Sequence, residues 1–161
     1  MPTLLVVYHS RTGAARQMAE AATAAAAAEA TTRLLPAEAA GPEDLLGADG
    51  YLFAAPENLA ALSGGMKDFL DRCYYPVLDR LNGRPYAALI AAGSDGTGAA
   101  RQLARICTGW RLRPVADPLI LVTRAQTPEA ILAPKALPPG DLARCADLGA
   151  ALAAGLAMGV F

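Results

Sequence analysis

Three short segments of the sequence carry residue types that bind small anionic and heteroaromatic molecules. Residues 10–15 read Ser-Arg-Thr-Gly-Ala-Ala, residues 56–65 read Pro-Glu-Asn-Leu-Ala-Ala-Leu-Ser-Gly-Gly, and residues 93–98 read Gly-Ser-Asp-Gly-Thr-Gly. Each segment follows a short apolar run and precedes a helix-forming stretch. The candidate ligand-binding residues are Ser10, Arg11, Thr12, Gly13, Ala14, Ala15, Pro56, Glu57, Asn58, Leu59, Ser63, Gly64, Gly93, Ser94, Asp95, Gly96 and Gly98.

The first segment, residues 10–15, has the composition of an anion-binding loop. Two hydroxyl groups, a glycine and the free backbone N–H groups at the start of a helix can together surround a phosphate group. The segment matches neither G-x-x-x-x-G-K-[ST] nor G-x-G-x-x-G, the loops that hold nucleoside triphosphates and dinucleotides. A single phosphate monoester is therefore the group that it fits best, and a plain strand-to-helix turn is the alternative.

The other two segments combine polar groups with small apolar residues, the mixture that a flat heteroaromatic ring requires. In the second segment, Asn58 and the backbone can serve the polar edge of a ring while aliphatic side chains cover its face. In the third segment, three glycines let the backbone approach a ligand closely. The alternatives are a flexible capping loop for the second segment and, for the third, a turn in which Ser94, Asp95 or Thr97 caps the next helix.

These segments depend on strands and helices that alternate along the whole chain. Apolar runs predict strands at residues 4–8, 31–35, 50–55, 85–92 and 119–123. Helices are predicted at residues 14–29, 64–77 with Ser63 as N-cap, 100–107 and 142–158, with a helical turn at 42–46 and a long surface connection at 124–140. The alternation predicts one α/β domain, residues 1–161, built on a doubly wound, five-stranded parallel sheet. A ligand is then expected at the carboxyl ends of the strands, where the winding reverses.

Composition and charge exclude several classes of function. The chain is 54% hydrophobic and 18% charged, which is typical of a folded domain with a sizeable core. Its formal net charge of −1 and the absence of basic runs argue against binding to nucleic acid. A carrier that docks by charge needs a field of one sign, and this chain lacks one. A small-molecule partner is therefore expected.

The cysteines and the single histidine do not indicate a metal site. Cys73, Cys107 and Cys145 are far apart and form no C-x-x-C pair, so we expect them to be reduced and buried. His9 is the only histidine, and we interpret it as a hydrogen-bonded residue at a strand end that has no catalytic role. No apolar run is long enough to cross a membrane and no signal peptide is visible, so a cytoplasmic location without membrane contact is expected.

The same segments carry a family resemblance that spans nearly the whole chain in the order of its elements. Residues 10–13 resemble the phosphate loop of flavodoxins and their relatives. Residues 56–72 resemble the stretch after strand three in the NAD(P)H-dependent FMN reductase and tryptophan-repressor-binding-protein-like quinone reductase branch, where a helix opens close to S-x-x-[ML]-K-x-F-[LF]-D-[RQ]. Residues 93–98 resemble the third flavin loop of that branch. The second segment and its helix are the most specific part of the resemblance.

The resemblance implies a fold, a cofactor and a reaction. The fold would be a three-layer, flavodoxin-like sandwich with strand order 2-1-3-4-5. The cofactor would be FMN, which would accept hydride from NAD(P)H and pass electrons to a quinone or similar small acceptor. The chemistry would be carried by the flavin, so no catalytic side chain is assigned. Backbone N–H groups near Asn58 and Gly93 would stabilise negative charge on the reduced ring. A homodimer or higher homo-oligomer is also implied.

The sequence departs from the family pattern at two places. Ala15 stands where a threonine usually closes the phosphate loop, and the three segments contain no Trp or Tyr to flank a ring. A flavodoxin-type electron carrier and a flavin-free relative that acts by interaction are therefore alternatives. A response-regulator domain would need acidic residues where the chain has His9-Ser10 and Ala55-Pro56. A low-molecular-weight phosphatase would need a cysteine in the first segment, and none is present there.

Overall fold

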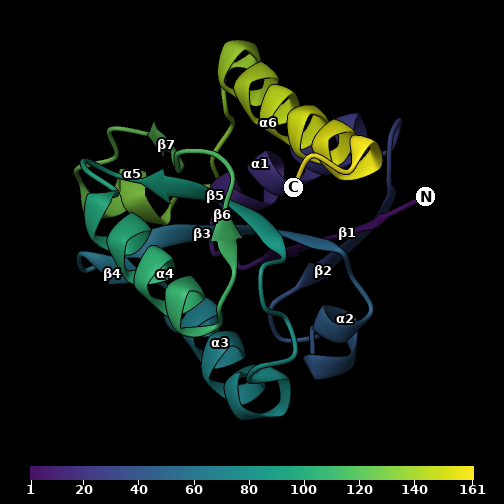
Figure 1. Cartoon of the computed structure of the whole chain (residues 1–161). Helices are drawn as coiled ribbons and strands as arrows, with labels where there is room; N and C mark the ends of the chain where they lie inside the picture. The colour runs from purple at the N-terminus through teal and green to yellow at the C-terminus, as the bar shows by residue number, and fades with distance from the viewer.

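The computed structural model describes residues 1–161 and has a central sheet with helices on both faces (Figure 1). The strands are β1 (Thr3–Tyr8), β2 (Thr31–Pro36), β3 (Gly50–Asn58), β4 (Ala61–Leu62), β5 (Pro85–Ala92), β6 (Arg113–Pro114) and β7 (Leu119–Val122). The helices are α1 (Ala14–Ala26), α2 (Pro42–Leu46), α3 (Gly64–Val77), α4 (Thr97–Gly109), α5 (Pro128–Leu132) and α6 (Pro139–Met158).

The sheet has the predicted parallel order. β2, β1, β3 and β5 lie side by side, and the position beyond β5 is shared by two short strands. β6 pairs with the start of β5 and β7 pairs with its end, so the predicted fifth strand is the second of two pieces. β4 is the only antiparallel strand, and it pairs with the end of β3. The doubly wound order 2-1-3-4-5 is confirmed, with the fifth position divided.

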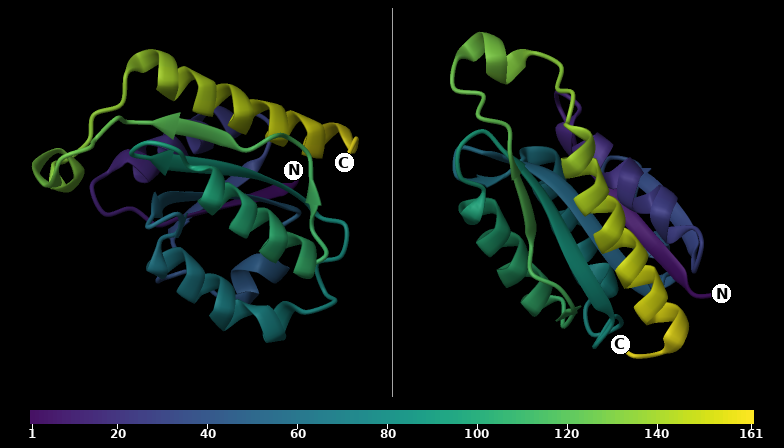
Figure 2. Two further views of the ribbon diagram at one scale, coloured as in Figure 1. Left: turned by 90° about the vertical axis from the view of Figure 1, so that its left-hand side faces the viewer. Right: turned by 90° about the horizontal axis from the view of Figure 1, so that it is seen from above.

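Two apolar cores separate the sheet from its two helical layers. α1 and α6 cover one face, and α2, α3 and α4 cover the other (Figures 1 and 2). Successive residues of β1 point to opposite cores: Leu4 and Val6 pack under α1 and α6, while Leu5 and Val7 pack under the other layer. Because both faces of the strand are covered, its sequence is continuously apolar and shows no alternation.

The alanine-rich helix α1 lies against α6. Its buried face is made of small residues and Met18, which lets the two helices approach closely. A Cβ atom on Gly149 of α6 would lie 2.2 Å from the backbone oxygen of Ala22. α1 ends at Ala26, three residues before the predicted end, where the N–H groups of Glu29 and Ala30 both donate to the Ala26 carbonyl oxygen. The run of alanines carries no signal that could mark this end.

Other boundaries also differ from the prediction, and α4 spans Thr97–Gly109 rather than residues 100–107. β3 continues through Pro56 to Asn58, and α6 begins at Pro139 rather than at residue 142. Pro56 does not end the strand because it still aligns with Ala91 of β5, and the next two residues turn into a hairpin with β4. None of the helices combines the length and hydrophobicity that a membrane span requires.

Candidate functional site

The largest surface cleft lies at the carboxyl edge of the sheet and has a volume of about 930 Å³. Its walls come from the three predicted segments and from the connection between β7 and α6, which projects beyond the sheet (Figure 2). We call that connection, residues 124–138, the strap. The lining residues are Ser10, Arg11, Thr12, Ala14, Ala15, Pro56, Glu57, Asn58, Leu59, Ala60, Ala61, Leu62, Gly64, Gly93, Ser94, Ala125, Gln126, Ile131 and Leu132.

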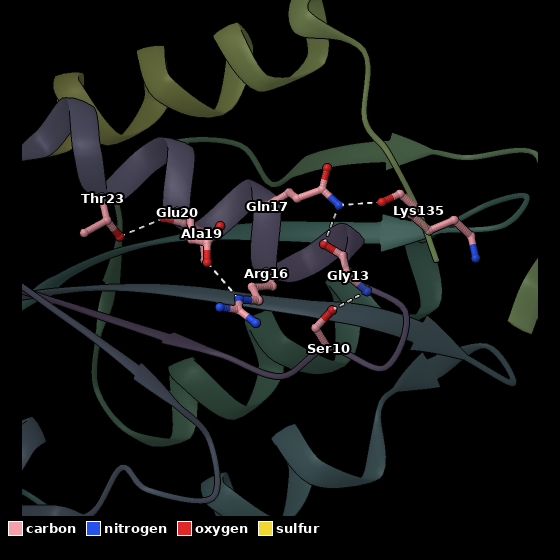
Figure 3. Close-up of polar contacts among 8 residues, drawn as sticks. All are labelled: Ser10, Gly13, Arg16, Gln17, Ala19, Glu20, Thr23 and Lys135. Carbon is pink, nitrogen blue, oxygen red and sulfur yellow. Dashed lines mark hydrogen bonds and ion pairs between the residues drawn. The ribbon is translucent and has the colours of Figure 1, made fainter. Parts of the chain in front are cut away.

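One end of the cleft is the N-terminus of α1, which is open to an anion. The Gly13 N–H donates to Ser10 Oγ (3.1 Å), and this bond closes the loop (Figure 3). The N–H groups of Arg11, Thr12, Ala14 and Ala15 donate to no protein acceptor. The first turn of α1 carries no acidic side chain. Free N–H groups and the positive end of the helix dipole therefore lie together at this end of the cleft, which suits a phosphate or carboxylate group.

The strap is tied to this loop by the side chain of Gln17. Gln17 Nε2 donates to the Gly13 carbonyl oxygen (2.9 Å) and to the Lys135 carbonyl oxygen (2.7 Å), as Figure 3 shows. Its Oε1 accepts from the Leu137 N–H (3.0 Å), and the Lys135 N–H donates to the Thr12 carbonyl oxygen (2.8 Å). The strap is thus a fixed wall of the cleft, and three of these hydrogen bonds join it to the start of α1 and the loop before it.

The second segment forms a tight β-hairpin whose tip lies at the cleft. Asn58 pairs with Ala61, and the two residues between them, Leu59 and Ala60, have φ angles of 51° and 62°. Two consecutive left-handed residues make a type I′ turn, which glycine and asparagine adopt far more readily than leucine and alanine. Leu59 is fully exposed at the tip. The hairpin presents the backbone of residues 58–60 and an aliphatic side chain to the cleft.

The carboxylate of Glu57 closes the N-terminus of the other helix at this edge. Its Oε1 accepts from the Gly96 N–H (2.9 Å) and its Oε2 from the Ala99 N–H (3.0 Å), so it caps α4 across 39 and 42 residues of sequence. Of the predicted caps, Asp95 accepts from the Thr97 N–H at 3.4 Å, and Ser94 and Thr97 cap no helix N–H. Because Glu57 caps α4, the start of that helix is closed to a ligand anion, whereas the start of α1 stays open.

His9 and Ser63 form a pair behind the cleft. His9 Nδ1 lies 2.7 Å from Ser63 Oγ, and Ser63 is completely buried. Burial lowers the pKa of His9 from 6.5; Arg11 also lowers it, while Glu38 acts in the opposite direction. Ser63 precedes α3 as predicted, but its hydroxyl caps no helix N–H because it is engaged by His9.

Comparison with known proteins identifies the family. Residues 37–127, more than half of the chain, match the family model for NADPH-dependent FMN reductase. The chain belongs to the NADPH-dependent FMN reductase family. A curated flavodoxin of Aquifex aeolicus (strain VF5) is 35% identical over 100 residues, which are 61% of this chain and 54% of that protein. The chain thus matches about half the length of this relative.

Solved structures share the fold of this reductase-family chain over nearly its whole length. The flavodoxin, WrbA-like protein of Agrobacterium tumefaciens superimposes with a TM-score of 0.79 at 19% identity and covers 99% of each chain. The rubredoxin oxygen:oxidoreductase of Desulfovibrio gigas superimposes with a TM-score of 0.78 at 15% identity, covering 98% of this chain but 37% of that one. The flavodoxin-like fold is therefore shown.

Most of the candidate residues of this FMN reductase-family chain are brought together in the cleft. Those that line it are Ser10, Arg11, Thr12, Ala14, Ala15, Pro56, Glu57, Asn58, Leu59, Gly64, Gly93 and Ser94. Five others do not. Gly13 supports the loop through Ser10, and Ser63 is buried against His9. Asp95 accepts from the Thr97 hydroxyl, the Gly96 N–H is bound by Glu57, and Gly98 packs against the hairpin.

Gly98 shows why this position excludes a side chain. A Cβ atom there would lie 2.1 Å from the Ala60 carbonyl oxygen, so the helix start and the hairpin touch through backbone alone. The sequence prediction of close backbone approach holds for this glycine, but the approaching group is the hairpin rather than a ligand.

The strap residues are the part of the site that sequence reasoning missed. Ala125, Gln126, Ile131 and Leu132 line the cleft, and Gln126 Nε2 donates to the Gly93 carbonyl oxygen (3.0 Å). No local motif marks these residues. The available signal was the length of the connection, since long loops in compact domains are usually functional.

Proposed function

We propose that this chain binds one FMN in the cleft and acts as an oxidoreductase, taking hydride from NAD(P)H and passing electrons to a quinone or similar small acceptor. Membership of the NADPH-dependent FMN reductase family supports both the cofactor and the hydride donor. The observation that carries the proposal is the open start of α1, with its loop of hydroxyl and free N–H groups, at one end of a cleft of about 930 Å³. One phosphate monoester and one extended flat group suit that geometry.

The residues of the cleft fit the two parts of FMN. The phosphate would be held by the hydroxyls of Ser10 and Thr12 and by the free N–H groups of residues 11–15. The ring would lie between the hairpin and the Gly93–Ser94 backbone, against aliphatic side chains such as Leu59 and Leu132. Ala15 supplies a backbone N–H but no hydroxyl. No aromatic side chain lines the cleft, so the ring would pack on aliphatic and backbone groups.

When bound, FMN supplies the hydride acceptor and the electron donor of such a reaction. The chain supplies position and electrostatics. Backbone N–H groups at residues 58–60 and at Gly93 would face the polar edge of the ring and stabilise negative charge there. Glu57 holds the hairpin and the third segment in one relative position, and the strap lines the inner side of the cleft.

A flavodoxin-type electron carrier is the second candidate function. The observation that favours it is the similarity to a curated flavodoxin over 61% of this chain. The net charge of −1 gives a weak electrostatic field for attracting a protein partner. This supports the function of a reductase over that of a carrier.

Anaerobic mixing of the FMN-loaded protein with NADPH, and separately with NADH, distinguishes the two. A reductase loses the visible flavin absorbance within seconds and regains it when a quinone is added. A carrier keeps its oxidised spectrum with either nucleotide but is reduced by dithionite. Failure to bind FMN at micromolar concentrations would leave the flavin-free relative as the function to pursue.

We also propose that the active form is a homodimer or higher homo-oligomer. Leu59 and Leu132 are exposed beside the cleft, and Ile131 is half-exposed next to them. A second copy would bury these side chains and cover the ring. Light scattering during size-exclusion chromatography tests this: a mass of 16.5 kDa at all concentrations would contradict it.

A further inference from the structure

Lys135 lies on the wall of a recess at the inner side of the cleft. The recess has a volume of about 90 Å³ and is shared by the first segment, the ends of β3 and β5, and the strap. Thr12 and Ala14 of the phosphate loop line it together with Lys135. A lysine that is 118 residues from Gln17 in sequence is thus placed beside the open start of α1.

The ammonium group of Lys135 is held by three neutral oxygen atoms. Nζ donates to the carbonyl oxygens of Ile131 (2.9 Å) and Ala133 (2.6 Å) and to Thr12 Oγ1 (3.2 Å). No carboxylate pairs with it, whereas the other lysine, Lys67, pairs with Asp71 at 2.6 Å. A partly buried cation without an anionic partner is costly, and an anion in the adjacent loop would offset that cost.

The contact with Thr12 also has a chemical consequence. Thr12 Oγ1 accepts a hydrogen bond from Lys135 and so uses a lone pair, which leaves its own O–H as a donor. The backbone fixes this arrangement, because the Lys135 N–H donates to the Thr12 carbonyl oxygen and Gln17 holds the Lys135 carbonyl oxygen. The lysine can therefore act by its charge and by turning the threonine hydroxyl toward an anion.

We propose that Lys135 stabilises the phosphate group at this site, through its charge and through the Thr12 hydroxyl, and that it gives the chain its preference for the phosphorylated flavin over riboflavin. The inference rests on the proposed function, since it assigns a further residue to the same site. Ala15 has no hydroxyl to interact with the phosphate. Lys135, which is far from Ala15 in sequence but beside the same loop, would supply a favourable interaction in its place. Arg11 is the other cation of the cleft, and its side chain is exposed and forms no ion pair.

A purely structural role makes a different prediction. Lys135 contacts the carbonyl oxygens at the end of α5, where a cation stabilises a helix end. If that were its whole role, replacing it would loosen the strap and weaken FMN and riboflavin equally. The ratio of the dissociation constants for FMN and riboflavin therefore distinguishes the two roles.

The test compares the binding of FMN and of riboflavin to the purified full chain by quenching of flavin fluorescence. Lys135→Met should weaken FMN binding about 10- to 100-fold, the effect of losing the nearby charge and the orientation of the Thr12 hydroxyl, and change riboflavin binding less than about 3-fold. Lys135→Arg should keep most of the preference for FMN. Lys67→Met is the matched control, since it removes the same charge from α3, away from the cleft, and should leave both constants unchanged.

The outcomes are distinct. Equal weakening of both ligands in Lys135→Met, or no weakening of FMN, would overturn the assignment of Lys135 while leaving FMN binding intact. If the wild-type chain bound neither ligand, the proposed function would fail and the assignment with it. Should Lys135→Met not fold, Lys135→Gln gives the same comparison of FMN with riboflavin.

Discussion

The carboxylate of Glu57 closes one of the helix starts at the cleft to ligand anions. It accepts two N–H groups at the start of α4, so a helix start that could have bound a phosphate is filled by the chain itself. It also joins the end of β3 to the third segment. The sequence placed Glu57 among ligand-binding residues, but nothing local indicated that it would cap a helix about 40 residues away.

We predict that Glu57→Gln lowers the free energy of unfolding by about 1–2 kcal/mol, the usual cost of losing a helix cap. An amide offers one acceptor oxygen where the carboxylate offers two. Urea denaturation measures the change. Glu29→Gln is the control, because Glu29 is exposed after α1 and forms no side-chain hydrogen bond. Equal losses in the two variants would contradict the capping role.

His9 gives a second prediction at the residue scale, on pH. Burial lowers its folded-state pKa below 6.5, with Arg11 acting in the same direction and Glu38 opposing. The unfolded chain therefore takes up this proton at a higher pH than the folded chain does. Stability from this source is fully present above pH 6.5 and is lost as the pH falls toward the folded pKa.

This pH dependence can be measured on one signal, because His9 is the only histidine. The imidazole proton resonance should titrate with a midpoint below 6.5. The wild type should also lose more unfolding free energy than His9→Gln as the pH falls from 7.5 to 5.5. A midpoint at or above 6.5, or parallel pH profiles for the two proteins, would contradict the burial of this ring.

At the scale of elements, the β3–β4 hairpin is the strained part of the site. Leu59 and Ala60 adopt left-handed conformations that usually require glycine or asparagine, and such strain is common at ligand sites. This is also why the sequence did not reveal the hairpin. Leu-Ala has no turn signature, so the segment was predicted as a loop, whereas Asn-Gly at the same place would have predicted a hairpin.

We predict that Ala60→Gly raises the free energy of unfolding by about 0.5–1 kcal/mol, because glycine adopts a φ of 62° without strain. Ala61→Gly is the matched control one residue later, in β4, where the backbone is extended and glycine should lower stability by about 0.5–1 kcal/mol. Thermal or urea unfolding of the two variants should therefore shift in opposite directions. A loss of stability in Ala60→Gly would show that the turn is not strained.

At the scale of the whole molecule, α1 is held in place by its packing on α6. The N-terminus of α1 lies at one end of the cleft, so this packing also positions the site. Gly149 lets the two helices touch at Ala22. We predict that Gly149→Ala costs about 1–3 kcal/mol of unfolding free energy, since the helices must move apart. Gly140→Ala, in the same helix but with open space around it, should be stabilising by up to about 1 kcal/mol. Similar effects of both substitutions on the melting temperature would contradict this packing.

The sequence predicted the fold better than it predicted the site. Strands buried on both faces have continuous apolar sequences, such as Leu4–Val7 and Pro85–Ala92. Because these strands alternate with helices, the sequence predicts a parallel sheet and the order of its elements. Contacts across the fold leave no local signal. Gln17 with Lys135, Glu57 with α4, and His9 with Ser63 all join residues that only the folded chain brings together.

The central claim is that FMN binds with its phosphate at the start of α1 and its ring between the hairpin and Gly93. Titrating the isotope-labelled chain with FMN, while following its amide resonances, tests both parts at once. We expect the largest shifts for the amides of residues 11–15, 58–60 and 93–94, saturating at one FMN per chain. Absence of shifts, or shifts centred on the hollow between α3 and α4 lined by Tyr74, Tyr75 and Trp110, would contradict it.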